Sequence, residues 1–234
     1  FMNGANYNDR NPYEPQISSY DYDAPLDEAG NATEKFMKFR EVIQKHLPAG
    51  VKLPQPAPAK PVISIPAIKF TKETSLFDML PEPVLSMVPL TFEDLQQAYG
   101  FVLYRTELNG GQTAMLKITD LRDYGIVFVN GKRAGVLDRR LKQDSLELSL
   151  PAGKVQLDIL VENLGRINFG PYLLKNKKGI TESVRFAGKE LKNWKMYKLP
   201  FDQPRTGVAV VKKTVNEGPA IKSGTFNLAR TGDT

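Results

Sequence analysis

Two neighbouring segments of the chain alternate between apolar and polar residues. Residues 146–150 place a leucine at every second position, and residues 155–161 place valine, leucine or isoleucine at every second position. Because successive side chains of a strand point to opposite faces of a sheet, each segment predicts a strand with one buried face. Asp158 falls between the inward-facing residues of the second segment, on its polar face. The turn-forming residues 151–153 predict that the two strands pair with each other as a hairpin.

A second hairpin is predicted around Asn130-Gly131. An apolar run at residues 125–129 precedes this pair, and residues 133–137 supply the return strand. Type I′ turns require positive φ at both central positions, which Asn-Gly adopts readily. With a buried strand at residues 101–105 and almost no helical periodicity in this part, the pattern predicts a mainly β chain, an antiparallel sandwich or jelly roll.

One amphipathic helix is expected near the N-terminus, after a polar, turn-rich loop over residues 1–30. Asn31 offers a capping oxygen with Glu34 three residues later, and apolar residues follow at helical spacing as far as Leu47. His46 falls in the last turn and is interpreted as a helix-end residue rather than a catalyst. Six prolines between residues 48 and 66 then predict a semi-rigid spacer and a domain boundary.

Length and composition bound the class of protein. The 234 residues suit one or two globular domains, with 41% apolar and 25% charged residues. No apolar stretch approaches the roughly 18 residues of a spanning helix, and the N-terminus lacks the order of a signal peptide. We therefore expect no membrane span, and the chain's beginning inside a polar loop suggests a fragment.

Missing residue types exclude several chemistries. The chain has no cysteine and a single histidine, which leaves no thiolate nucleophile, no Ser-His-Asp relay and no sulfur-based metal site. Asp120, Asp123 and Asn130 lack the spacing of a calcium loop and are interpreted as solvated turn residues, so no metal is expected. The net charge of +6 is dispersed without interleaved aromatics, so no nucleic-acid partner is expected.

Two polar-aromatic clusters remain as candidate sites. Tyr20, Asp21, Tyr22 and Asp23 follow one another in the N-terminal loop, and rings beside carboxylates suit sugar recognition. The competing interpretation is that the tyrosines pack and the aspartates cap turns. The cluster at residues 162–170 is interpreted as a structural pair of Glu162 and Arg166 that closes a loop, in preference to a binding site.

The order of these motifs resembles glycoside hydrolase family 35 β-galactosidases. The similar stretches are residues 1–6 (Phe-Met-Asn-Gly-Ala-Asn), residues 19–30 with the Tyr-Asp-Tyr-Asp run, residues 99–105, Val129-Asn130-Gly131, residues 160–170 and Trp194. They span about nine-tenths of the chain. Residues 218–221 and 224–228 look like the entry to a second jelly roll of that family.

The resemblance implies four regions. Residues 1–47 would be the last loop and helix of a (β/α)8 catalytic barrel, and residues 48–89 a Pro-rich linker with short strands. Residues 90–200 would form a jelly-roll, galactose-binding-like antiparallel β-sandwich, and residues 201–234 the start of a second, incomplete sandwich.

The family retains anomeric configuration with two glutamates on earlier barrel strands, and neither glutamate motif is matched in this sequence. The resemblance thus implies no catalytic residue in this chain and no cofactor. It places Tyr22 in the galactose pocket, with Asp21 and Asp23 orienting its loop. The implied partners are a β-galactoside and the remainder of the barrel. The compartment stays open, with the family favouring periplasm or secretion.

Two other functions fit a jelly roll. A noncatalytic carbohydrate-binding module is the main alternative, although aromatics suited to a sugar platform are not evident within residues 115–200. A purely structural or interaction domain is the third.

Overall fold

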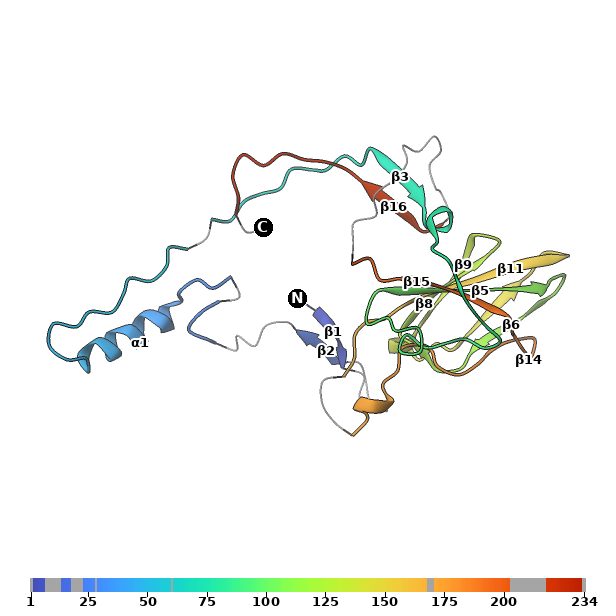
Figure 1. Ribbon diagram of the computed structural model, residues 1–234, viewed down its shortest axis with the longest axis horizontal. Helices are drawn as coiled ribbons and strands as arrows, with labels where there is room; N and C mark the ends of the chain where they lie inside the picture. Colours follow the sequence, from blue (N-terminus) through green and yellow to red (C-terminus); the bar gives the residue numbers. More distant parts are fainter. Residues whose placement is uncertain are drawn as a thin grey trace. The chain divides into compact units, whose positions relative to one another are not determined.

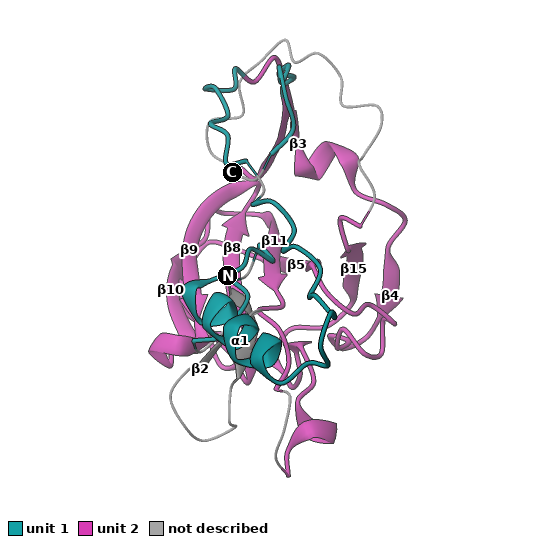
Figure 2. Ribbon diagram, turned by 90° about the vertical axis from the view of Figure 1, so that its left-hand side faces the viewer, with its two compact units in different colours: residues 1, 17–69, 224–234 teal, residues 2–16, 70–223 magenta. Residues whose placement is uncertain are grey.

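The computed structural model describes residues 2–6, 14–17, 23–27, 29–59, 61–167, 171–202 and 218–232. The chain divides into two compact units (Figure 2). One comprises residue 1 with residues 17–69 and 224–234, and the other comprises residues 2–16 and 70–223. Two short strands near the N-terminus, β1 (Met2–Asn6) and β2 (Glu14–Ile17), form a two-stranded sheet.

Two antiparallel sheets dominate the larger unit (Figure 1). The six-stranded sheet has the order β4 (Val84–Ser86), β15 (Trp194–Leu199), β5 (Phe101–Asn109), β11 (Lys154–Glu162), β8 (Tyr124–Val129) and β9 (Lys132–Asp138). The four-stranded sheet has the order β10 (Ser145–Ser149), β6 (Thr113–Ile118), β13 (Val184–Phe186) and β14 (Lys189–Glu190). This unit also contains short elements: β7 (Leu121–Arg122) pairs with β12 (Gly179–Ile180), and three 3₁₀ helices are η1 (Leu76–Met79), η2 (Arg139–Leu141) and η3 (Leu173–Lys175).

The main hydrophobic core lies between the two sheets. Leu116 and Ile118 of the four-stranded sheet and Leu157 of β11 are fully buried members of this core. Tyr104 and Trp194 meet there edge to face, with ring centroids 6.4 Å apart. Side chains from both sheets therefore fill one interior, which confirms the predicted antiparallel β-sandwich.

The alternating segments become strands, but the hairpin predicted between them is wrong. β10 pairs with β6, and β11 pairs with β5 and β8. The turn backbone bonds to another loop, since the Gly110 and Gly111 amides donate to the Gly153 and Pro151 carbonyls. Residues 151–153 thus carry the chain from one sheet to the other. The apolar faces of β10 and β11 both line the main core, one from each sheet. The alternation of apolar residues therefore could not show which strand each of them pairs with.

The Asn130-Gly131 turn is confirmed. Asn130 has φ 50° and Gly131 φ 79°, and Val129 pairs with Lys132 across the turn. The Asn130 side chain also accepts a hydrogen bond from the Gln156 amide at 2.9 Å. The return strand β9 runs one residue further at each end than expected.

Asp158 lies on the face of the six-stranded sheet opposite the main core, and this second face is also covered. Leu76 of η1 packs with Leu103, Leu160 and other residues in a second buried cluster on that face. Asp158 has no exposed surface there, and Arg105 Nε donates to Asp158 Oδ1 at 2.6 Å. The guanidinium of Arg105 also lies over the rings of two neighbouring aromatic residues, Phe77 and Tyr197.

Strands from the expected linker and from the C-terminal region pair with each other. β3 (Lys72–Ser75) and β16 (Ala220–Ser223) form an antiparallel ladder, which places Ile221 against the second cluster. The three boundaries drawn from the sequence between the four regions stay predictions.

The smaller unit contains α1 (Glu34–Lys45), with His46 at its C-cap as expected. The cap at the start differs from the expected one. Thr33 Oγ1 accepts from the Phe36 amide at 3.4 Å, whereas the Asn31 side chain bonds to Asp27. No residue of α1 is buried. Within the described residues, no helix is long and apolar enough to cross a membrane.

Candidate functional site

The structure describes one of the three site residues implied by the family resemblance. Tyr22 and Asp21 lie outside the described residues. Asp23 has φ 64°, and its Oδ2 lies 2.6 Å from Lys35 Nζ of α1. The Asp23 carbonyl accepts from the same ammonium group at 2.6 Å. Asp23 is therefore tied to the helix at two points.

The rest of this loop is anchored to the start of α1. Thr33 donates through Oγ1 to the Pro25 carbonyl at 2.8 Å and through its amide at 3.1 Å. Asp27 accepts from the backbone amide and the side-chain amide of Asn31, which lower the pKa of its carboxyl group. The residues just after the Tyr-Asp-Tyr-Asp run thus form a braced turn rather than an open loop.

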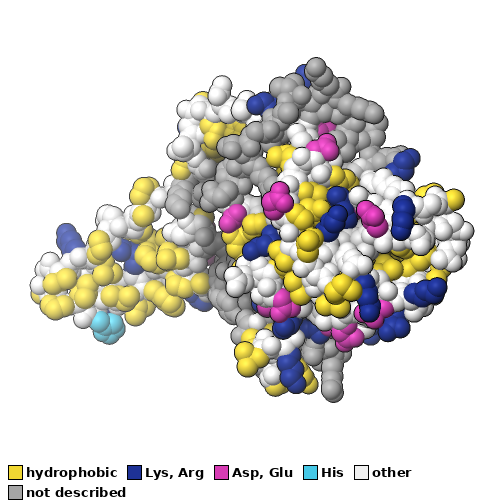
Figure 3. Space-filling model, turned by 45° about the vertical axis from the view of Figure 1, so that its right-hand side comes forward, with side chains coloured by type: hydrophobic (Ala, Val, Ile, Leu, Met, Phe, Trp, Pro, Cys, Tyr) yellow, Lys and Arg dark blue, Asp and Glu magenta, His cyan; other side chains and the backbone are white. Residues whose placement is uncertain are grey.

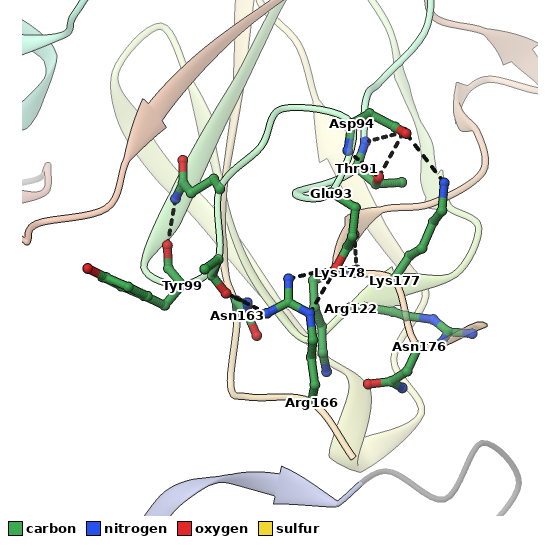
Figure 4. Close-up of polar contacts among 12 residues, drawn as sticks. Thr91, Glu93, Asp94, Tyr99, Arg122, Asn163, Arg166, Asn176, Lys177 and Lys178 are labelled. Atoms are coloured by element: carbon green, nitrogen blue, oxygen red, sulfur yellow. Dashed lines mark hydrogen bonds and ion pairs between the residues drawn. The ribbon is translucent and has the colours of Figure 1, made fainter. Parts of the chain in front are cut away.

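A second polar cluster occupies one end of the sandwich. We call this region the loop end; it comprises residues 91–100, 120–123, 163–167 and 171–178. Figure 4 shows side chains from these segments converging on Arg166 and Lys178, while the ring of Tyr99 points away.

Lys178 and Asp123 form the centre of this cluster, and neither side chain is exposed. Lys178 Nζ lies 2.7 and 3.0 Å from the two carboxylate oxygens, and Arg139 Nη1 lies 3.1 Å from Oδ1. Burial lowers the pKa of Lys178 to about 8, against the opposing attraction of Asp123. Asp123 Oδ2 also accepts from the Leu164 amide at 3.0 Å, so the buried pair holds the backbone of the following loop.

Arg166 closes this loop, but its carboxylate partner is not the expected Glu162. Arg166 Nη2 and Nε lie 2.6 and 3.0 Å from Glu93 Oε1, and Arg166 Nη1 donates to the Ala98 carbonyl. Glu93 Oε2 accepts from the Lys178 amide at 3.0 Å. Glu162 lies elsewhere, half-buried, and burial raises the pKa of its carboxyl group. Arg166 therefore closes the loop as expected, but it does so through Glu93 instead of Glu162.

The three residues weighed as calcium ligands do not form one site. Asp120 is bonded to Arg122 Nε at 2.9 Å and to the Thr181 hydroxyl. Asp123 is buried, so its interpretation as a solvated turn residue is wrong. Asn130 lies in the β8–β9 turn, at the opposite end of β8 from Asp123. In the described part of the chain, no group of three or more Asp, Glu or His side chains could hold a metal ion.

The polar side chains of the loop end bind backbone amides and one another, and this arrangement suits a structural role better than a catalytic one. Asp120, Asp123 and Glu93 each contact a lysine or arginine, so these carboxylates are engaged in charge-assisted bonds. The amide of Ile167 is held in turn by Asn176 Oδ1 at 3.3 Å. Sequence reasoning missed Lys178 and Glu93, because their partners lie 55 and 73 residues away and no periodic pattern marks either residue.

Comparisons with known proteins place the chain in a family. Residues 1–46 match the family described as glycosyl hydrolases family 35, and residues 89–200 match the first all-beta domain of beta-galactosidase. A beta-galactosidase of Xanthomonas manihotis is 40% identical over 237 residues, covering 100% of this chain and 39% of that protein. Beta-galactosidase 1 of Dictyostelium discoideum is 33% identical with the same coverages, and the mouse beta-galactosidase is 40% identical over 85% of this chain and 31% of its own length.

Among solved structures, a GH2 beta-galacturonidase from Eisenbergiella tayi aligns with a TM-score of 0.31 and 15% identity, over 59% of this chain and 26% of that one. This likeness is too weak to bear on fold or function. The two sequence matches lie in the order expected from the motifs, and the relatives from Xanthomonas manihotis and Dictyostelium discoideum align along the whole chain. The chain belongs to glycosyl hydrolase family 35 and corresponds to a C-terminal region of its β-galactosidases.

Proposed function

We propose that the intact protein carrying this chain is a retaining β-galactosidase that hydrolyses terminal non-reducing β-D-galactosyl residues. In this proposal the chain supplies a supporting sandwich and one loop of the substrate pocket. The chain spans 39% of the length of the curated relatives from Xanthomonas manihotis and Dictyostelium discoideum. Their printed names support the activity proposed for the intact protein.

The observation that carries the proposal is the exposed apolar side of α1. This helix falls within the family 35 match, yet Phe39 and Ile43 are 52% and 49% exposed. Figure 3 shows hydrophobic side chains gathered over the part of the molecule that carries the single histidine, His46. An amphipathic helix gains most of its stability by burying such a side. We infer that the remainder of the catalytic barrel covers it.

Tyr22 is the proposed substrate contact, with Asp21 and Asp23 as supports of its loop. The paired bonds from Lys35 to Asp23 and the Thr33 cap support this assignment, because they fix the end of the loop against α1. A ring can stack on the apolar face of galactose, while its hydroxyl group bonds to a sugar hydroxyl. In this proposal Tyr22 binds and orients the sugar and transfers no proton.

The chain is proposed to contribute no catalytic group. A retaining glycosidase uses two carboxyl groups about 5–5.5 Å apart, one as acid/base and one as nucleophile. The family resemblance places both on barrel strands that have no counterpart in this sequence. The engaged carboxylates of the loop end support this division of labour, since each is held by a cation rather than facing a second carboxylate.

The noncatalytic sugar-binding alternative has less support. An open cavity of about 460 Å³ lies between the β8–β9 turn and β10, within the size range of ligand sites. Asn130, Arg133 and Glu147 line it together with apolar residues, but no aromatic side chain does. The cavity thus lacks the ring on which a sugar would stack.

The proposal is tested with an aryl β-galactoside. The intact protein is expected to release the aryl group, and the chain alone is expected to show no turnover above a mock preparation. Turnover by the pure chain would contradict the absence of a catalytic pair, and an inactive, folded intact protein would contradict the proposed activity.

A further inference from the structure

The loop end presents apolar side chains to solvent from a rigid base. Leu174 of η3 is 97% exposed, Leu173 is 47% exposed, and Tyr99 is 54% exposed. Single exposed apolar residues are common on protein surfaces. Here, however, an almost fully exposed leucine follows a loop whose backbone is held by buried charged and polar groups.

Several interactions fix the segments that carry these residues. Asp123 and Asn176 accept from the amides of Leu164 and Ile167. Arg122 Nη1 contacts the Lys175 carbonyl of η3 at 3.5 Å, and the Arg166–Glu93 pair joins this loop to the segment that ends at Tyr99. Ordering a surface segment in advance lowers the entropy lost when a partner binds. The segments that carry the exposed apolar residues are therefore already ordered before a partner binds.

The charge around the leucines indicates the chemistry of the partner. Lys175 and Lys177 follow the two leucines along the chain, and both side chains are exposed. Lys177 has only a 3.4 Å contact with Asp94, which is itself exposed. A complementary surface would combine an apolar pocket for the leucines with carboxylates at its rim.

The family matches indicate where such a surface belongs. A family 35 match and the sandwich match occur in one chain, and the relatives extend well beyond the aligned region. A catalytic domain on the same polypeptide is present at high effective concentration, so a modest surface is enough to hold it.

We propose that the loop end docks on the part of the family 35 catalytic domain that lies outside this chain, with Leu174 as the central anchor. The occupant is a surface of that domain with an apolar pocket and an acidic rim. This inference rests on the proposed function only in requiring that a catalytic domain be present. The sandwich then braces that domain through a preformed contact rather than through a flexible tether alone.

The test uses the absence of cysteine from the chain. Leu174→Cys is introduced into the intact protein, and its maleimide labelling is followed by peptide mass spectrometry in the folded and the urea-unfolded protein. Docking predicts labelling about tenfold or more slower in the folded protein. Leu85→Cys is the matched control, because Leu85 is 70% exposed on the edge strand β4, and its folded and unfolded rates should agree within about threefold.

A folded rate at position 174 within about threefold of the unfolded rate would overturn the proposal. Protection that disappears on dilution would overturn it too, because the occupant would then be a second copy. Leu173→Cys, labelled in the same way, should show the same protection. This second variant shows whether the result at position 174 is caused by the substitution itself. Labelling does not depend on turnover, so an inactive protein that still protects Leu174→Cys would refute the proposed activity and leave the docking intact.

Discussion

Lys178 Nζ lies 2.7 Å from Asp123 Oδ2, and both side chains are completely buried. The pair joins segments that are 55 residues apart, and the same carboxylate holds the Leu164 amide and Arg139. A buried ion pair costs desolvation, which close geometry and added hydrogen bonds offset. Its role here is to fix the backbone of the loop end rather than to supply net stability.

Removing one partner should therefore be costly. Asp123→Asn withdraws the carboxylate from both Lys178 and Arg139 and is expected to lower the unfolding free energy by about 3–5 kcal/mol. Lys178→Met leaves Arg139 beside Asp123 and should cost less. The double variant should be more stable than Asp123→Asn alone, as measured by urea unfolding. Strictly additive losses would show that the two side chains are not coupled.

Acid stability should depend in part on Asp138. Hydrogen bonds from the Arg140 guanidinium, at distances down to 2.6 Å, lower the pKa of this carboxyl group. A carboxyl group with a lowered folded-state pKa stabilises the fold above its unfolded value of 3.8, and this contribution is lost as the pH falls through the folded value.

Asp138→Asn should thus cost about 1 kcal/mol at pH 7, discounted because Arg140 is partly exposed, and should flatten the acid limb of the stability curve. Thermal unfolding between pH 2 and pH 7 measures both effects, with Asp202→Asn, at an exposed position, as the control. An unchanged acid limb would show that Asp138 is not a source of the acid dependence.

Local sequence patterns predicted where the strands and turns lie better than they predicted which strands pair with each other. The Asn130-Gly131 turn and the strands that flank it depend on neighbouring residues, which are visible in the sequence. The pairing of β10 and β11 does not, because an apolar face fits either sheet around the same core. Asp158 illustrates the same limit, since the face of the sheet on which it lies is covered in part by η1, which is distant in sequence.

Charged residues of the candidate sites were harder to predict. Lys178 and Asp123 have the sequence character of surface residues, and only the three-dimensional fold brings them together. Arg166 was expected to close a loop, but Glu93 could not be chosen over Glu162 without tertiary contacts. Tyr22 was singled out through the family resemblance, since the composition of its loop allowed packing and sugar contact alike.

The exposed side of α1 provides a differential test of burial in the intact protein. Phe39→Asp should have little effect on the stability of the chain alone, because Phe39 is already 52% exposed. In the intact protein the same change should lower the unfolding free energy by about 1.5–3 kcal/mol, the value of burying a large apolar side chain.

Denaturant unfolding of both proteins measures this difference, and Lys38→Asp on the same helix is the control for introducing an acid. Equal effects of Phe39→Asp in the two proteins would mean that no other part of the polypeptide covers this side of the helix.

Kinetics of Tyr22 variants in the intact protein test whether Tyr22 contacts the galactosyl ring. Tyr22→Phe removes one hydroxyl group, whose hydrogen bond is worth about 0.5–1.5 kcal/mol to a neutral partner and about 1.5–3 kcal/mol to a charged one. This range corresponds to a loss of roughly 2- to 150-fold in kcat/KM. Tyr22→Ala also removes the ring and should lose more.

Tyr124→Phe removes a hydroxyl group from the sandwich and should leave kcat/KM within about twofold of the wild type. The measurement is kcat/KM for an aryl β-galactoside, with the thermal midpoint of each variant recorded to show that it is folded. We expect a large loss for Tyr22→Ala and an intermediate loss for Tyr22→Phe. A folded Tyr22→Ala protein with wild-type kcat/KM would contradict this contact.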